Sequence, residues 1–193
     1  MAYSAKDYSQ LLGLSGFSET LLTNHFTLYE GYVKNTNALS EKLKALSENG
    51  EFSIPEFAEL KRRFGWEWNG MRMHEFYFGN MTKESSALSE GDLKEKLVTA
   101  YGSLENWEKN FVGTGSMRGI GWVVLAHDME SGELYNVWVN EHDTGHLVGT
   151  KPLLIMDVFE HAYMIDYGIK RADYITSFMK AIDWKTVEKR FAA

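Results

Sequence analysis

Apolar residues recur every three or four positions over the first part of the chain. Residues 18–46 form one such repeat, which predicts a long amphipathic helix that begins near Ser18 and Glu19. A second repeat covers residues 55–81 and opens with proline, a residue that suits a first helical turn. Between them, residues 47–50 read Ser-Glu-Asn-Gly, which is typical of a helix stop with a turn. Two long helices with so short a break predict an antiparallel helical hairpin.

Beyond this hairpin the pattern of apolar positions changes. Two shorter helices are predicted over residues 85–103 and 104–115. Short apolar runs follow, and the first two flank a turn that contains Gly132. Their length and composition predict three strands, over residues 121–128, 134–143 and 153–159. Helical periodicity returns over residues 160–180, and a short terminal helix is predicted from Asp183 onwards.

These elements predict an α+β protein in two parts. Residues 1–85 form the N-terminal long antiparallel helical hairpin, and residues 86–193 form a C-terminal mixed α/β half with a small three-stranded antiparallel sheet. The boundary is expected within residues 83–90. A chain of 193 residues accommodates one large domain or two small ones that share a core, so we expect the two parts to pack together.

Composition argues against several classes of function. No apolar run is long enough to span a bilayer, and the first residues lack a basic region followed by a long apolar core. We therefore expect no membrane partner and favour the cytoplasm. The formal net charge of −7 argues against a nucleic acid partner, because phosphates need a basic surface, but it allows a small anionic substrate at a local positive site. The chain has no cysteine, which excludes disulfides and thiolate ligands.

Three of the six histidines share an apolar context. His25, His74 and His161 lie among apolar and aromatic residues, and Asp157 ends an apolar strand. A lone histidine in such a place is usually a core residue with a hydrogen-bond partner, but these four polar groups would all be costly to bury unpaired. A single metal ion would satisfy them together. Three imidazoles and a carboxylate suit Fe, Mn or Zn, and structural zinc more often has cysteine ligands.

The C-terminal region resembles the iron/manganese superoxide dismutase family. From Asp157 it reads DVFEHAYMIDYG, against a family signature of D-x-W-E-H-A-Y-Y followed by a long helix and a W-x-x-V terminal helix. Three earlier stretches resemble the family in the same order. NHFTLYEGYVKNTNAL is similar to its first helix, WNGMRMHEFYF to its second helix and GIGWVVL to its glycine-tryptophan strand. The similarity therefore spans nearly the whole chain.

The resemblance implies an antioxidant oxidoreductase that converts superoxide to dioxygen and hydrogen peroxide. It implies one Fe or Mn ion per subunit, alternately reduced and oxidised at the junction of the two parts, with the ligands His25, His74, Asp157 and His161. Tyr32 corresponds to the tyrosine that guards substrate access, and Trp122 to an aromatic wall of the pocket. Glu160 matches a glutamate that bonds a ligand histidine of the partner subunit, so a homodimer is expected.

A further position concerns the group that hydrogen-bonds the solvent on the ion. Iron enzymes commonly have glutamine four residues before the second histidine ligand, where this chain has Gly70, as manganese-type members do. Those members supply the group from the loop after the strand hairpin, and the matching place here holds His142. The resemblance thus implies that Tyr32, His142 and the bound solvent deliver protons. A donor at this place tunes the pKa of the bound solvent and the potential of the metal. The choice between Fe and Mn stays open.

The first helix departs from the family pattern. Residues 28–30 read Leu-Tyr-Glu where the family usually has a His-His pair associated with the substrate gate and dimer contact. His25 and Tyr32 are seven residues apart, where eight is common. At ~100° per residue, seven steps return almost to the same helix face, whereas eight need a local bulge. We therefore expect an unbulged helix that turns both side chains to the ion. An ungapped alignment would instead put Asn24 in the ligand place.

The C-terminal motif also departs from the family at Phe159, where tryptophan is usual, and at Met164, where tyrosine is usual. The first change keeps an apolar wall but loses an indole donor, and the second alters the dimer seam. Two rival functions follow from these residues. One is a non-catalytic metal-binding relative, which the missing histidine pair favours. The other is a non-haem iron oxygenase with two histidines and one carboxylate, against which a third histidine ligand argues. Dimer and tetramer both stay open.

Overall fold

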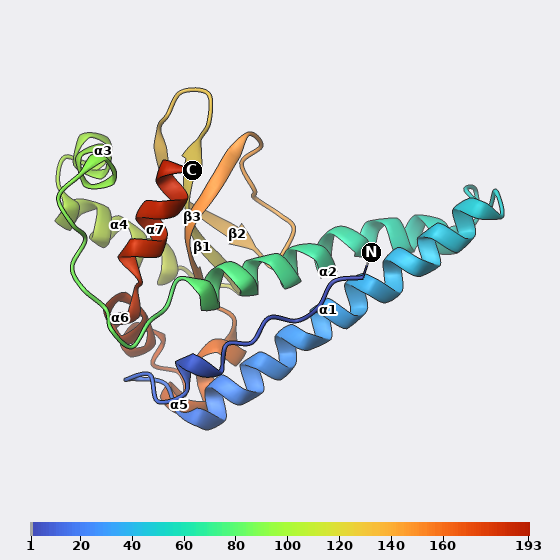
Figure 1. The fold of residues 1–193 in the computed structure, drawn as a ribbon, viewed down its shortest axis with the longest axis horizontal. Coiled ribbons are helices and arrows are strands. Elements are labelled where there is room, and N and C mark those ends of the chain that lie inside the picture. The colour runs from blue at the N-terminus through green and yellow to red at the C-terminus, as the bar shows by residue number, and fades with distance from the viewer. Residues whose placement is uncertain (1) are drawn as a thin grey trace.

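The computed structural model describes residues 2–193 and confirms the α+β architecture. A hairpin of two long helices precedes a body of shorter helices around a small sheet (Figure 1). The helices and strands run in the order α1 (Glu19–Glu48), α2 (Pro55–Gly79), α3 (Asp92–Tyr101), α4 (Leu104–Gly115), β1 (Gly121–Asp128), β2 (Leu134–Asn140), β3 (Thr150–Asp157), α5 (Met164–Tyr167), α6 (Arg171–Ala181) and α7 (Trp184–Ala192). Short 3₁₀ turns occupy Ser9–Leu11 and Glu160–Ala162.

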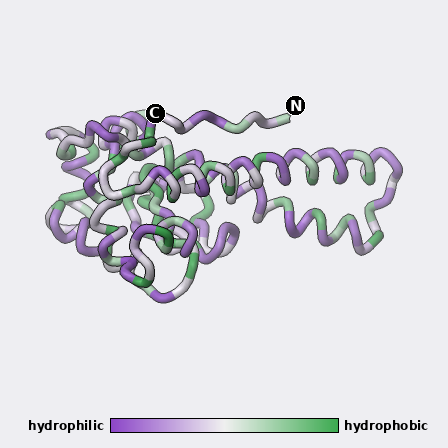
Figure 2. Tube along the Cα trace, turned by 90° about the horizontal axis from the view of Figure 1, so that it is seen from below, coloured by the Kyte–Doolittle hydropathy of each residue, from purple (hydrophilic) through white to green (hydrophobic). Residues whose placement is uncertain are grey.

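The hairpin forms where its apolar repeat and its capping residues agree. The Ser18 hydroxyl accepts the backbone N–H of Leu21 at 3.0 Å, which satisfies one of the free donors at the start of α1. Pro55 occupies the first turn of α2, where its missing N–H costs nothing. Hydrophilic and hydrophobic residues alternate along both helices, and the N-terminal segment runs back beside them (Figure 2). The two helices pack along their apolar faces, and the hairpin tip projects from the body.

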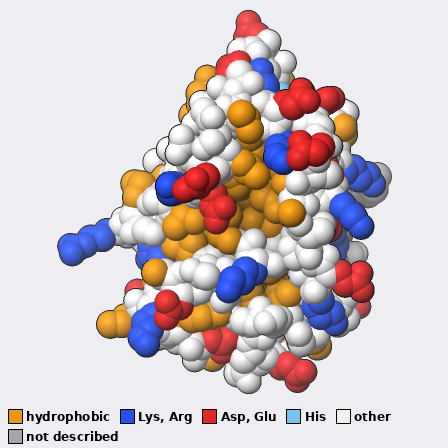
Figure 3. All heavy atoms as spheres, turned by 90° about the vertical axis from the view of Figure 1, so that its left-hand side faces the viewer, with side chains coloured by type: hydrophobic (Ala, Val, Ile, Leu, Met, Phe, Trp, Pro, Cys, Tyr) orange, Lys and Arg blue, Asp and Glu red, His pale blue; other side chains and the backbone are white. Residues whose placement is uncertain are grey.

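The sheet brings Trp122 beside Asp157. Its strand order is β2-β1-β3, with both neighbours antiparallel to the central β1. In that register Trp122 pairs with Val139 on one side and with Asp157 on the other. Helix α2 contacts β3, and α4 contacts β1 and β2. On the side of the body formed by α3, α4 and α6, apolar side chains gather between charged ones (Figure 3).

The segment after the sheet differs from the sequence prediction. One helix was expected over residues 160–180, but the chain forms a 3₁₀ turn, the short α5 and then α6. Gly168 ends α5 with φ 54° and ψ −127°, a conformation that residues with a side chain rarely adopt. The periodicity of apolar residues continues across this break, which is why the pattern alone did not show it. No helix within residues 2–193 is long and apolar enough to cross a membrane.

Candidate metal centre

Four side chains from four elements converge where the hairpin meets the sheet. His25 comes from α1, His74 from α2, Asp157 from the end of β3, and His161 from the 3₁₀ turn that follows. One potential ligand atom from each lies within 4.8 Å of all the others. His25, His74 and Asp157 are buried, and His161 is partly exposed. Residues up to 136 positions apart thus form a single cluster, and the four predicted ligands are brought together.

Asp157 is the centre of this cluster. Its Oδ2 lies 3.2 Å from Nε2 of His25, 3.1 Å from Nε2 of His161 and 3.7 Å from Nε2 of His74. Its Oδ1 accepts the backbone N–H of Phe159 at 2.8 Å, which fixes the carboxylate orientation. Burial favours the neutral acid, but the imidazoles of His161 and His25 outweigh it and hold the pKa of Asp157 far below its usual value. A buried carboxylate therefore stays ionised.

One of the histidines presents an unprotonated nitrogen to the cluster. Nδ1 of His74 donates to the carbonyl of Gly70 at 2.5 Å, so its Nε2 carries no proton in the neutral ring. That Nε2 is buried and has no hydrogen-bond partner within residues 2–193. Burial lowers the pKa of both His25 and His74, which keeps them neutral as a metal requires. An orphaned lone pair beside an ionised carboxylate and two further imidazoles fits a divalent Fe or Mn ion.

A hydrogen-bonded chain of three side chains runs past this cluster. The indole N–H of Trp122 donates to Nδ1 of His142 at 3.0 Å, and Nε2 of His142 lies 2.8 Å from the hydroxyl of Tyr32. Burial lowers the pKa of His142 to about 4, so the ring is neutral at pH 7. Because Nδ1 accepts, the proton of the neutral ring is on Nε2, and His142 donates to Tyr32. The ring of Tyr32 stacks on His74, with centroids 5.1 Å apart.

Helix α1 is continuous between His25 and Tyr32, and both side chains face the cluster. The seven-residue spacing therefore needs no bulge in this structure. Tyr29 lies on the same face, in the region where the family pattern has its histidine pair. Its hydroxyl contacts the Glu75 carboxylate at 3.2 Å and accepts the backbone N–H of Lys6 at 3.0 Å. The N-terminal segment thus reaches the helix face that carries the metal cluster.

Gly70 lies under the ring of Tyr32. A Cβ atom added at Gly70 would lie 2.5 Å from Cδ1 and 2.7 Å from Cε1 of that ring. Contacts that short do not occur between real atoms, so no side chain fits at position 70 while Tyr32 holds its place. A hydrogen-bond donor at position 70 is therefore incompatible with this place of Tyr32.

Sequence reasoning missed two residues that hold His142. The Trp66 ring lies 4.4 Å from the His142 ring, and its indole N–H donates to Glu141 at 3.2 Å. Glu141, which precedes His142 in the chain, has φ 49°, the one positive value among non-glycine residues 2–193. Trp66, Gly70 and His74 follow one another at intervals of four on α2, which is the signal that could have placed Trp66 at the site.

One further residue was predicted at the subunit seam. Glu160 is exposed. Arg171 donates to the carbonyls of Met117 and Gly119, both at 2.7 Å, so its guanidinium fixes the segment that leads into β1. Phe159 stacks on both His142 and His161, at 4.8 and 5.1 Å, and so forms an apolar wall of the site.

Comparison of the sequence with known proteins points to one family. A family model described as iron/manganese superoxide dismutases, C-terminal domain, matches residues 89–190. A manganese superoxide dismutase of Haloferax volcanii is 37% identical over 175 residues, which cover 90% of this chain and 86% of that protein. An iron superoxide dismutase of Cupriavidus metallidurans is 36% identical, with 93% and 91% covered, and one of Aquifex pyrophilus is 34% identical, with 96% and 89% covered. The chain belongs to the iron/manganese superoxide dismutase family.

Proposed function

We propose that the protein is a superoxide dismutase that holds one Fe or Mn ion per subunit on His25, His74, Asp157 and His161. The convergence of these four side chains, from both parts of the molecule, is the observation that carries the proposal. The ion would supply reversible one-electron chemistry, taking an electron from one superoxide and returning it to a second. Dioxygen and hydrogen peroxide are the products, and two protons are consumed.

The side chains around the cluster contribute proton delivery to this reaction. His142 donates to the oxygen of Tyr32, so the hydroxyl proton of Tyr32 is free to point away from His142. Burial raises the pKa of Tyr32 well above its usual value, so the phenol keeps this proton until a stronger base than water arrives. Superoxide that gains an electron takes up protons and is such a base. We assign Tyr32 as the proton donor, His142 as the group that orients it, and Trp122 as the group that fixes the tautomer of His142.

The walls of the site restrict what can enter. Trp122 is fully buried, and Phe159 and Tyr32 are each 9% exposed, so the lining is aromatic and closely packed. The side chain of His161, at 28% exposed, is the most accessible of the four predicted ligands. A small anion can approach past His161, whereas an organic co-substrate would meet packed rings. This supports superoxide over the substrates of a non-haem iron oxygenase.

Superoxide decay, followed by stopped-flow on protein loaded separately with Fe and Mn, tests the proposal. We expect catalysed decay with at least one metal and loss of both metal and activity in His74→Ala. His127→Ala is the matched control, because His127 packs against Phe191 outside the cluster, and it should retain both. Full metal occupancy with background decay would instead make the chain a non-catalytic metal-binding relative. A missing metal in all preparations would reject the site.

We further propose that two subunits associate through the face around Glu160. Large apolar side chains are exposed near it in the chain, with Met164 at 44%, Ile165 at 51% and Ile169 at 94%. Isolated subunits rarely expose such groups together, and a two-fold contact would cover them. Light scattering after size exclusion should give a dimer mass, and Ile165→Lys should shift it toward the monomer. A monomer mass for the unmodified protein at micromolar concentration would contradict this.

A further inference from the structure

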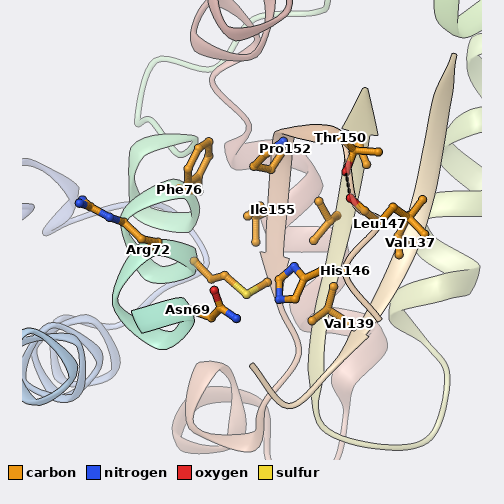
Figure 4. Close-up of a pocket in the computed structure, with 13 residues that line it drawn as sticks. Asn69, Arg72, Phe76, Val137, Val139, His146, Leu147, Thr150, Pro152 and Ile155 are labelled. Carbon is orange, nitrogen blue, oxygen red and sulfur yellow. Dashed lines mark hydrogen bonds between the residues drawn. The ribbon is translucent and has the colours of Figure 1, made fainter. Parts of the chain in front are cut away.

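A cavity of about 230 Å³ lies between α2 and the sheet (Figure 4). Helix α2 forms one wall, the three strands form the opposite wall, and the loop between β2 and β3 borders the mouth. The floor is apolar, and its residues are at most 6% exposed: Met73, Val124, Ala126, Val139 and Ile155. An apolar cavity of about 150 Å³ holds benzene, so this one has room for a single ring with a small substituent.

Two of the polar residues at the rim already have a hydrogen-bond partner outside the cavity. The guanidinium of Arg72 pairs with Glu75 at 2.8 Å, lies over Trp68 at 5.0 Å, and points away from the cavity (Figure 4). The hydroxyl of Thr150 donates to the carbonyl of Leu147 at 2.7 Å. The lining therefore presents no unpaired formal charge, which favours a neutral ligand.

His146 and Asn69 are the polar residues that remain available, and the Asn69 carboxamide offers both donors and an acceptor. Nε2 of His146 lies 2.9 Å from the carbonyl of His142, and since a carbonyl only accepts, Nε2 carries the proton. Nδ1 of the neutral ring is then an acceptor without a partner within residues 2–193. Figure 4 shows the imidazole reaching from the loop toward Asn69 on the opposite wall. A ligand that complements this arrangement has an apolar body and one hydroxyl, which can donate to the imidazole and accept from the carboxamide.

We propose that this cavity binds a small neutral aromatic molecule with a hydroxyl group, of the phenol class. The ring lies on the apolar floor, and the hydroxyl donates to Nδ1 of His146. Through its Nε2 the same imidazole contacts the backbone carbonyl of His142. His146 therefore connects a bound phenol to His142, whose side chain belongs to the hydrogen-bonded chain at the metal centre. The proposal does not depend on dismutase activity, because binding is measured directly.

Calorimetric titration of the metal-loaded protein with p-cresol tests the site. Val137 lines the cavity, and Val148 lies on the same loop region but is fully exposed and outside the lining. We expect Val137→Phe, which fills the cavity, to weaken p-cresol binding at least tenfold. The same exchange at the control position, Val148→Phe, should change it less than twofold. Absence of saturable binding to the unmodified protein, or equal binding to both variants, overturns the proposal.

The hydroxyl contact is tested by pairing two ligands with one further variant. 4-Methylanisole keeps the ring and the oxygen but has no donor, so we expect it to bind at least fivefold more weakly than p-cresol. His146→Leu should remove this preference, because it keeps an apolar side chain of similar length and loses the acceptor. A preference for p-cresol that survives in His146→Leu, or its absence in the unmodified protein, overturns the assignment of a phenol. A thermal unfolding curve like that of the unmodified protein shows that each variant is folded.

Discussion

Gly70, whose side chain is a single hydrogen atom, packs directly against the ring of Tyr32. Because any Cβ atom would lie 2.5 Å from that ring, Gly70→Ala has to displace the tyrosine. We predict that dismutase activity falls by about 10²-fold, the typical contribution of a positioned proton donor, while metal content is retained. Gly65→Ala, on the same helix, is the matched control, because a Cβ atom added there has no neighbouring atom within 4 Å. Equal activities of the two variants, measured by stopped-flow, would contradict the role assigned to Tyr32.

His142 couples stability to pH. Its pKa is lowered from 6.5 to about 4 by burial, so between these values the unfolded chain binds a proton that the folded protein does not. As the pH falls below about 6.5, proton binding stabilises the unfolded state relative to the folded state. The stability that neutral His142 contributes is therefore fully present above about pH 6.5 and lost toward pH 4. We predict that, between pH 7 and pH 4.5, the free energy of unfolding of the metal-free protein falls by on the order of 2 kcal/mol more than that of the metal-free His142→Gln variant. Urea unfolding measures this, and parallel losses in the two proteins would refute it.

The predicted metal ligands could be grouped from the sequence because each was a polar residue in an apolar context. That reasoning needs only local patterns, and it found His25, His74 and Asp157 without any knowledge of their contacts. Trp66 and Glu141 could not be found in this way. Their contact joins α2 to a loop 75 residues later, and it depends on the positive φ of Glu141, which no periodicity encodes.

Among the elements, the N-terminal segment acts as a strap across the hairpin. The Glu75 carboxylate, with its side chain 7% exposed, accepts from Lys6 at 2.9 Å and from Arg72 at 2.8 Å. Its Oε1 also contacts the Tyr29 hydroxyl at 3.2 Å. A nearly buried carboxylate with three donors from three parts of the chain ties the strap to α1 and α2.

We predict that Glu75→Gln lowers the free energy of unfolding by about 1–3 kcal/mol, because it leaves charged donors without their acceptor. Lys6→Met should cost less than ~1 kcal/mol, since the Lys6 side chain is 58% exposed and water screens its pair. Glu48→Gln is the control, from an exposed pair on α1 in which both partners are more than half exposed. Urea unfolding compares the three, and a Glu75→Gln cost no larger than that of Glu48→Gln would contradict the strap.

Helix boundaries followed the sequence closely where capping residues agree with periodicity, as at Ser18 and Pro55. They failed between α5 and α6, where Ile165 and Ile169 continue an apolar spacing of four across the break. Both side chains are exposed, so the repeat there does not mark a buried helix face. In the isolated chain an apolar repeat has two explanations, a core face or a surface that another subunit covers, and the pattern alone does not distinguish them.

At the scale of the whole molecule, the metal cluster is where the two parts join. We propose the division into residues 1–85 and 86–193 as structural units that share this cluster, since α1 and α2 supply two of its side chains and the segment from β3 onward supplies the other two. An ion bound there has to hold both units in the same arrangement. A ligand that binds only the folded state stabilises every element whose unfolding would disrupt the binding site.

The shared cluster predicts how amide hydrogen exchange changes when Mn is bound. Amides in the middle of α1, α2, β1 and β3 should all slow together on metal loading, because opening of either unit separates the cluster and releases the ion. The hairpin tip, around residues 47–54, projects from the body and should exchange equally fast in both states. His161→Ala should remove the slowing in all four elements at once, since the loss of one ligand weakens the hold on the ion throughout. If metal loading protects the sheet and leaves α1 and α2 unchanged, the ion is held by one unit alone and the convergence of the two units on it is wrong.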